Sequence, residues 1–172
     1  MTPSWTARYA DLAGKAIIVA GDEAGAVIEV ARALAANGAL IAVVAADRDV
    51  VDAAVAGLDA QAFAMAADPT SEAVWARIVP HVEQRLGPID AVVTIGATAG
   101  DRAVVAAAVV GDMAARRRGV VIEVGPDPTG KVWDGVRRRH IVGGAPESIA
   151  AAVLLCASDA MPAGSLRIEL QE

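Results

Sequence analysis

A glycine-containing turn near the amino end of the chain is the first feature that suggests a chemistry. The apolar run Ala16–Ala20 leads into Gly21, and Gly25 follows at the start of an apolar helical stripe. Glycines at a strand-to-helix turn let backbone N–H groups approach a phosphate, which the positive end of the helix dipole favours. Gly21 and Gly25 are therefore candidates to bind a dinucleotide. Asp22 and Glu23 either oppose an anion there or are solvated turn residues that point away from it.

The other reactive side chains form no pattern typical of a metal site or of a nucleophile. His81 lies in a helical pattern and His140 in an arginine-rich segment, and neither has a spaced partner. Both are therefore interpreted as surface residues. Cys156 is the only cysteine and lies in an apolar run, which favours a buried, inert thiol. We predict no metal site and no catalytic residue among them.

Two arginine triplets interrupt a chain whose net charge is −6. Arg116–Arg118 ends a predicted helix, where the negative end of the helix dipole stabilises cations. The second triplet, Arg137, Arg138 and Arg139, is predicted to lie in a loop after Trp133. There it either binds an anion or a protein partner, or it is simply solvated.

The elements that must position these residues alternate between strands and helices, which predicts an α/β domain with a mainly parallel sheet. Apolar runs predict strands at Ala16–Ala20, Ala39–Ala46, Gln61–Ala67, Ile89–Gly96, Val120–Val124 and Ser165–Leu170. Helical periodicity predicts helices at Ala24–Asn37, Asp49–Leu58, Ser71–Leu86, from Asp101 or Arg102 to the first arginine triplet, and from Pro146 to Ala157. The segment Gly125–Gly144 shows no clear period. We expect a single domain over residues 1–172, a shortened, doubly wound parallel sheet of about six strands with helices on both faces.

Short segments spread in order along the chain resemble the short-chain dehydrogenase/reductase family. They are Leu12–Lys15 before the first strand, Ala20–Val27 at the TGxxxGxG turn, Ala67–Thr70 with the adenine-contacting aspartate, Gly87–Asp90 before the fourth strand, and Gly143–Asp159 at the late helix. The resemblance implies a Rossmann-like fold. It also implies that NAD(P), if any nucleotide binds, contacts Gly21, Gly25, Asp68 and Gly96.

The positions that carry the family's chemistry differ in this sequence. Val27 replaces the third glycine of the turn, Thr94-Ile95-Gly96-Ala97 replaces the NNAG segment, and Pro126 stands at the catalytic serine position. The Tyr-x-x-x-Lys pair, whose tyrosine is the family's general acid/base, has no counterpart. The only tyrosine is Tyr9, and the only lysines are Lys15 and Lys131. The short chain after Pro126 predicts that the helix carrying this pair, and the strand after it, are deleted. The resemblance therefore implies a degenerate member with no catalytic residues and no expected cofactor.

The sequence thus predicts a non-catalytic subunit, a structural or regulatory partner of an active short-chain dehydrogenase of the hydroxyacyl-CoA or ketone/alcohol type. The alternatives are a weak NAD(P)-binding protein and a stand-alone enzyme of different chemistry. In this family the late helix and last strand commonly make dimer contacts, and the resemblance implies that both are retained here. We therefore expect an oligomer with this chain itself or with an intact family subunit, through Pro146, Ile149, Ala152, Val153, Leu166 and Ile168.

Composition excludes other function classes. An acidic chain lacks the positive surface that nucleic-acid binding requires, and an anionic membrane surface would repel it. No apolar run reaches the roughly 18 residues of a membrane span, and the first residues hold no signal-peptide core. A cytoplasmic location is expected.

Overall fold

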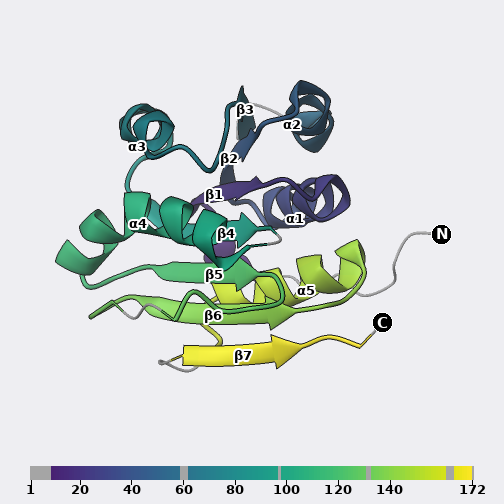
Figure 1. The fold of residues 1–172 in the computed structure, drawn as a ribbon, viewed down its shortest axis with the longest axis vertical. Helices are drawn as coiled ribbons and strands as arrows, with labels where there is room; N and C mark the ends of the chain where they lie inside the picture. Colours follow the sequence, from purple (N-terminus) through teal and green to yellow (C-terminus); the bar gives the residue numbers. More distant parts are fainter. Residues whose placement is uncertain (1–8, 59–61, 97, 131–132, 162–164, 172) are drawn as a thin grey trace.

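Seven parallel strands form one sheet in the computed structural model, which describes residues 9–58, 62–96, 98–130, 133–161 and 165–171 (Figure 1). The strand order is β3-β2-β1-β4-β5-β6-β7, and every neighbouring pair is parallel. The strands are β1 Ala16–Gly21, β2 Leu40–Ala45, β3 Ala62–Ala66, β4 Ile89–Ile95, β5 Val120–Val124, β6 Arg137–Val142 and β7 Ser165–Glu169. The helices are α1 Ala24–Ala36, α2 Arg48–Val55, α3 Glu72–Leu86, α4 Ala99–Ala115 and α5 Pro146–Ala157, after a short 3-10 turn η1 Ala10–Leu12. The predicted α/β class and the doubly wound parallel sheet are confirmed, with one strand more than expected.

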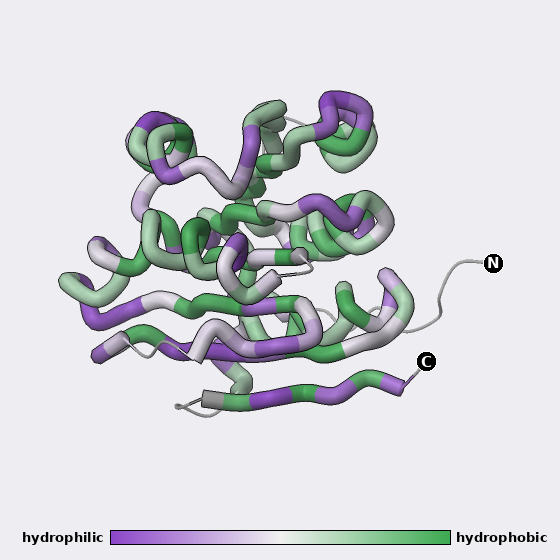
Figure 2. The backbone as a smooth tube through the Cα atoms, viewed as in Figure 1, coloured by the Kyte–Doolittle hydropathy of each residue, from purple (hydrophilic) through white to green (hydrophobic). Residues whose placement is uncertain are grey.

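Helices cover both faces of the sheet because its central strands are apolar on both sides. Along β1, Ile17 and Val19 pack into one core cluster, whereas Ile18 and Ala20 pack into the other. The first cluster contains residues of α1, α2 and α5, and the second contains residues of α3 and α4. Figure 2 shows hydrophobic residues concentrated along the central strands, and hydrophilic residues interspersed along β6 and β7. No helix in the described parts of the chain is long and apolar enough to cross a membrane.

The second arginine triplet lies in strand β6, so the prediction of a loop at Arg137–Arg139 is wrong. The sequence also predicts that the strand following the Tyr-x-x-x-Lys helix is deleted. That prediction is wrong, because β6 is present there and pairs in parallel with β5. His140, predicted to be a surface residue, is only 3% exposed. Two cations of the strand have partners in the fold: Arg137 pairs with Asp159 and Arg138 pairs with Glu123. Neither partner is close to the strand in sequence.

The connection between β5 and β6, residues 125–136, contains no helix among its described residues. Parallel strands are usually joined through a helix, and Figure 1 shows an irregular chain in its place. Trp133 and Val136 from this connection pack with the cluster that contains α3 and α4. The crossover therefore lies on the opposite face of the sheet from α5.

Candidate functional site

A cleft with a volume of about 210 Å³ lies at the carboxyl ends of the central strands. Ligands of doubly wound sheets bind beyond these strand ends, at the point where the strand order reverses. That point lies between β1 and β4 in this sheet. Its walls come from the ends of β1 and β4, the segments that follow β2 and β3, and the start of α4: Ala20, Gly21, Asp22, Ala46, Asp68, Pro69, Thr70, Thr94, Ile95, Gly96, Asp101, Arg102 and Val105.

Three of the four predicted cofactor-binding residues, Gly21, Asp68 and Gly96, line this cleft, whereas Gly25 does not. A Cβ at Gly21 would overlap the carbonyl oxygen of Ile95 and lie 2.9 Å from its carbonyl carbon. A Cβ at Gly25 would lie 3.2 Å from the Pro146 ring, at the contact between α1 and α5. Packing between elements therefore accounts for both glycines of the turn, whether or not a nucleotide binds beside them.

Asp68 lies in a loop that its own hydrogen bonds fold. Its Oδ1 accepts bonds from the Thr70 hydroxyl at 2.7 Å and from the Thr70 backbone N at 2.9 Å. These bonds hold the pKa of Asp68 below its usual value. The buried Trp75 indole donates to the Pro69 carbonyl at 2.8 Å and anchors the loop on α3. Asp68 is thus an ionised, exposed group at the rim of the cleft.

The acidic residues of the glycine turn differ in position. Asp22 lines the cleft, and a Cβ at Gly96 would lie 3.3 Å from its Oδ1. Glu23 is exposed at the N-cap of α1 and does not line the cleft. Val27 is completely buried in the core cluster with α1. The Val27 side chain therefore packs in the core and not in the cleft, and Asp22 is the group that would oppose a phosphate.

Arg102, which the sequence analysis did not single out, occupies the cleft wall next to β4 and β5. Its side chain is 1% exposed and donates hydrogen bonds to the Gly96 and Asp127 carbonyls. A Cβ at Gly125 would lie 2.7 Å from the Arg102 guanidinium carbon, so only glycine leaves room for it. Burial lowers the pKa of Arg102, and the charge of Glu123 opposes this shift. Arg102 thus joins the end of β4 to the loop after β5.

Buried polar side chains continue from this wall across the sheet. Thr94, Glu123 and His140 lie at paired positions of β4, β5 and β6, on the face that α3 and α4 cover. Glu123 is 0% exposed and accepts a bond from Arg138 Nε at 2.7 Å. The His140 ring bonds the Gly125 carbonyl at 2.9 Å, and burial lowers its pKa, so it is neutral at pH 7. A charged residue inside the apolar run Val120–Val124 is the sequence signal that could have indicated this cluster, because a buried charge requires a partner.

The remaining predicted reactive residues lie outside the cleft. His81 is exposed on α3, as predicted, with its ring 5.7 Å from that of Phe63. Cys156 is a buried free thiol, as predicted, and burial raises its pKa to about 11, which makes a thiolate nucleophile unfavourable. Among the described residues, no three His, Cys, Asp or Glu side chains are grouped as metal ligands.

The predicted interface residues divide into a buried set and an accessible set. Ile149, Ala152 and Val153 are buried in the core cluster, because α5 packs along α1 and over β5 and β6. Pro146 and Ile168 are half-buried, and Leu166 is 37% exposed on the edge strand β7. The late helix is thus covered largely by its own chain.

Comparison with known proteins identifies the family and the fold. The family model for short chain dehydrogenases matches residues 15–110, from the start of β1 into α4. No curated protein matches the chain. Solved structures share the fold at low identity. A metagenomic short-chain oxidoreductase in complex with NADP has a TM-score of 0.75 and 17% identity, over 94% of this chain and 99% of that chain. The NADH-dependent reductase A1-R' complexed with NAD has a TM-score of 0.76 and 15% identity, over 94% of this chain and 96% of that chain. Serine dehydrogenase from Escherichia coli has a TM-score of 0.74 and 15% identity, over 90% of this chain and 96% of that chain.

Proposed function

We propose, from the premise that this chain belongs to the short chain dehydrogenase family, that it is a non-catalytic member with a structural role as a subunit of an oligomer. The connection between β5 and β6 is the observation that carries this proposal. In the family that the chain resembles, a helix with the Tyr-x-x-x-Lys pair is expected at this place. Residues 125–136 contain no tyrosine, and their described part forms no helix. Without a tyrosine hydroxyl near the strand ends, the family's general acid/base is missing.

The positions of the remaining tyrosine and of the described lysine support the proposal. Tyr9 lies before η1, and its backbone N–H bonds Asn37 at the end of α1. Lys15 precedes β1, at the amino end of the sheet, and its amine pairs with Asp159 at 3.0 Å. Both are therefore at the opposite end of β1 from the candidate cleft, whose lining includes neither residue. Glu123 and His140 could exchange protons chemically, but their burial keeps a substrate away from them.

The candidate cleft does not fit a dinucleotide well. Its volume of about 210 Å³ is below the roughly 300–1,000 Å³ typical of small-molecule sites. The Asp22 carboxylate lies over Gly96, where it would repel a phosphate. The similar structures in complex with NADP and NAD show that this fold can hold such cofactors in other proteins. For this chain we expect weak nicotinamide binding or none.

Purified protein is expected to show no NAD(P)-dependent turnover of ketones, alcohols or hydroxyacyl-CoA thioesters, because it lacks the tyrosine acid/base. Absorbance assays with both nicotinamides measure turnover, and calorimetric titration measures binding. A full-length family member assayed in parallel is the positive control. Stoichiometric turnover that persists through further purification would contradict the proposal, and so would nicotinamide binding with a low-micromolar Kd.

The surface proposed for assembly is the groove between α5 and β7, and its proposed occupant is a second copy of this chain. The groove has a volume of about 480 Å³ and a largely apolar lining: Tyr9, Ser148, Ala151, Ala152, Leu154, Leu155, Ile168 and Leu170. Next to it, β7 is the edge strand among the residues that the structure describes, and the backbone groups along such an edge favour pairing with another chain. Leu166 on β7 is the one exposed large hydrophobic residue in the part of the chain that the structure describes. A two-fold contact would cover both copies of this surface.

The substitution Ala151→Glu is expected to convert a wild-type dimer to a folded monomer, because it places a charge in the groove without changing the core. Ala73→Glu, at an exposed position of α3, is the matched control and should leave the dimer intact. Light scattering measures the oligomeric state, and circular dichroism verifies folding. A monomeric wild type at tens of micromolar would contradict self-association. If such a monomer then formed a stable complex with a co-expressed intact family subunit, the partner would be heterologous.

A further inference from the structure

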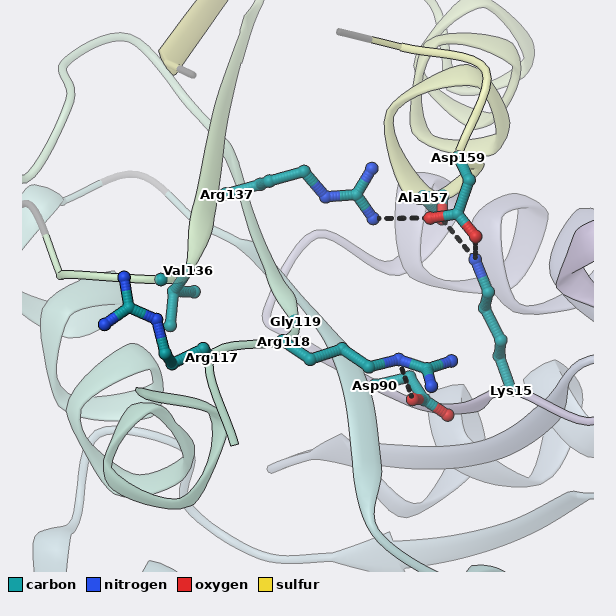
Figure 3. Close-up of a pocket in the computed structure, with 10 residues that line it drawn as sticks. Lys15, Asp90, Arg117, Arg118, Gly119, Val136, Arg137, Ala157 and Asp159 are labelled. Atoms are coloured by element: carbon teal, nitrogen blue, oxygen red, sulfur yellow. Dashed lines mark hydrogen bonds and ion pairs between the residues drawn. The ribbon is translucent and has the colours of Figure 1, made fainter. Parts of the chain in front are cut away.

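A second pocket, of about 480 Å³, lies at the amino end of the sheet, away from the candidate cleft (Figure 3). It is bounded by the residues that begin or precede β1, β4, β5 and β6 and by the end of α5: Lys15, Asp90, Arg117, Arg118, Gly119, Gly135, Val136, Arg137, Ala157 and Asp159. Its volume lies within the range of roughly 300–1,000 Å³ for small-molecule sites. Neither the family resemblance nor the proposed function assigns anything to it.

The lining carries four positive side chains and two negative ones, although the whole chain has a net charge of −6. Both carboxylates are already occupied by partners of this chain. Asp159 accepts bonds from Lys15 and Arg137, each at 3.0 Å. Asp90 Oδ2 accepts a bond from the backbone N–H of Ala16 at 3.1 Å. Positive side chains therefore outnumber negative ones in the pocket lining.

The two arginines that face this pocket differ in how firmly they are held. Arg137 donates to the Ser158 carbonyl at 3.3 Å and to Asp159, which fixes its guanidinium on the pocket wall. Arg118 is 67% exposed, and among the described residues its only ionic partner is Asp90, 3.7 Å from Nε. That distance is too long for a hydrogen bond. The Arg118 guanidinium thus retains donors for a ligand, and Figure 3 shows it directed between Asp90 and Lys15.

The turn that presents Arg118 has an unusual backbone. Arg117 is the one non-glycine residue in the described part of the chain with a positive φ, at 50°. Gly135 accommodates this turn, because a Cβ there would lie 2.8 Å from Arg117 Cα. The Arg117 side chain points away from the other labelled charges in Figure 3 and pairs with exposed Asp134. The left-handed backbone at Arg117 thus turns the Arg117 and Arg118 side chains in different directions, and Arg118 is directed toward the pocket.

We propose that this pocket binds a small organic anion through a phosphate or carboxylate group, with Arg118 and Arg137 as its direct hydrogen-bond donors. A guanidinium presents paired N–H donors that match either anion in a bidentate arrangement. Lys15 supplies nearby positive charge, because its amine already contacts Asp11, Asp159 and the Ala157 carbonyl. Arg118 exchanges its weak pairing with Asp90 for the ligand.

Calorimetric titration of the full chain with inorganic phosphate, pyrophosphate and citrate, at constant ionic strength, tests the proposal. We expect saturable binding of at least one probe, and a loss of at least about tenfold in affinity in Arg118→Gln, since that variant removes charge-assisted hydrogen bonds. Arg48→Gln, on the exposed surface of α2, is the matched control and should bind like wild type. Binding by the phosphate probes alone, or by citrate alone, identifies the group that the pocket takes.

The proposal is overturned if no probe saturates the wild type at millimolar concentrations, or if Arg118→Gln binds as tightly as Arg48→Gln. Arg118 is largely exposed, so its variant should keep the wild-type melting temperature without ligand. If that temperature nevertheless falls, Arg137→Lys provides the second test. It keeps the charge but removes the paired donors, and it should also weaken binding severalfold. Because this pocket and the candidate cleft lie at opposite ends of the sheet, the result is independent of the turnover assay.

Discussion

Replacing Glu123 by alanine is expected to lower the free energy of unfolding by about 3–5 kcal/mol, because it leaves buried guanidinium groups without their counter-charge. Glu123 is 0% exposed and accepts a 2.7 Å bond from Arg138, whose side chain is 13% exposed. Arg102 is 1% exposed, and the charge of Glu123 also stabilises its protonated guanidinium. Denaturant titration followed by circular dichroism measures the loss.

Two variants make this test specific. Glu123→Gln keeps the shape of the side chain and removes only the charge, so its loss should be smaller than that of Glu123→Ala. Asp52→Ala breaks an exposed pair in which Asp52 lies 4.0 Å from Arg48, and it should cost less than about 0.5 kcal/mol. A Glu123→Ala protein within about 1 kcal/mol of wild type would show that the buried cluster does not stabilise the crossover between β5 and β6.

Gly21→Ala is expected to destabilise the protein by about 3 kcal/mol, at the upper end of the cost of overpacking a core. The added Cβ would overlap the Ile95 carbonyl oxygen, and a backbone atom cannot move aside as a side chain can. β1 and β4 would have to separate where Gly21 pairs with Ile95. Thermal and denaturant unfolding in the absence of any nucleotide measure this effect.

Gly111→Ala is the matched control for this substitution. Gly111 lies within α4, and a Cβ there would have no atom within 4 Å. Alanine should therefore stabilise the helix by about 0.5–1 kcal/mol. If Gly21→Ala instead unfolded like wild type and altered only nucleotide binding, the glycine would serve a ligand and not the contact between strands.

Much of the fold could be predicted from the sequence because its signals are local. Continuous apolar runs indicate β1, β2, β4 and β5, and helical periodicity indicates α1. The strand-to-helix pattern indicates the glycine turn, whereas the family resemblance implies Asp68 and Gly96, and the structure brings Gly21, Asp68 and Gly96 together in one cleft. These residues can meet because parallel strands in an alternating chain present their carboxyl ends at one edge of the sheet.

The sequence by itself thus determined the family and the parallel sheet. Only the tertiary structure decided that Arg137–Val142 is a strand, because Glu123 and Asp159 pair with its arginines from distant positions in the chain. It also decided that Val27 points into the core and that α1 covers much of α5. Ion pairs and helix contacts between distant residues leave no periodic signal in a sequence, so these features exist only once the elements have packed.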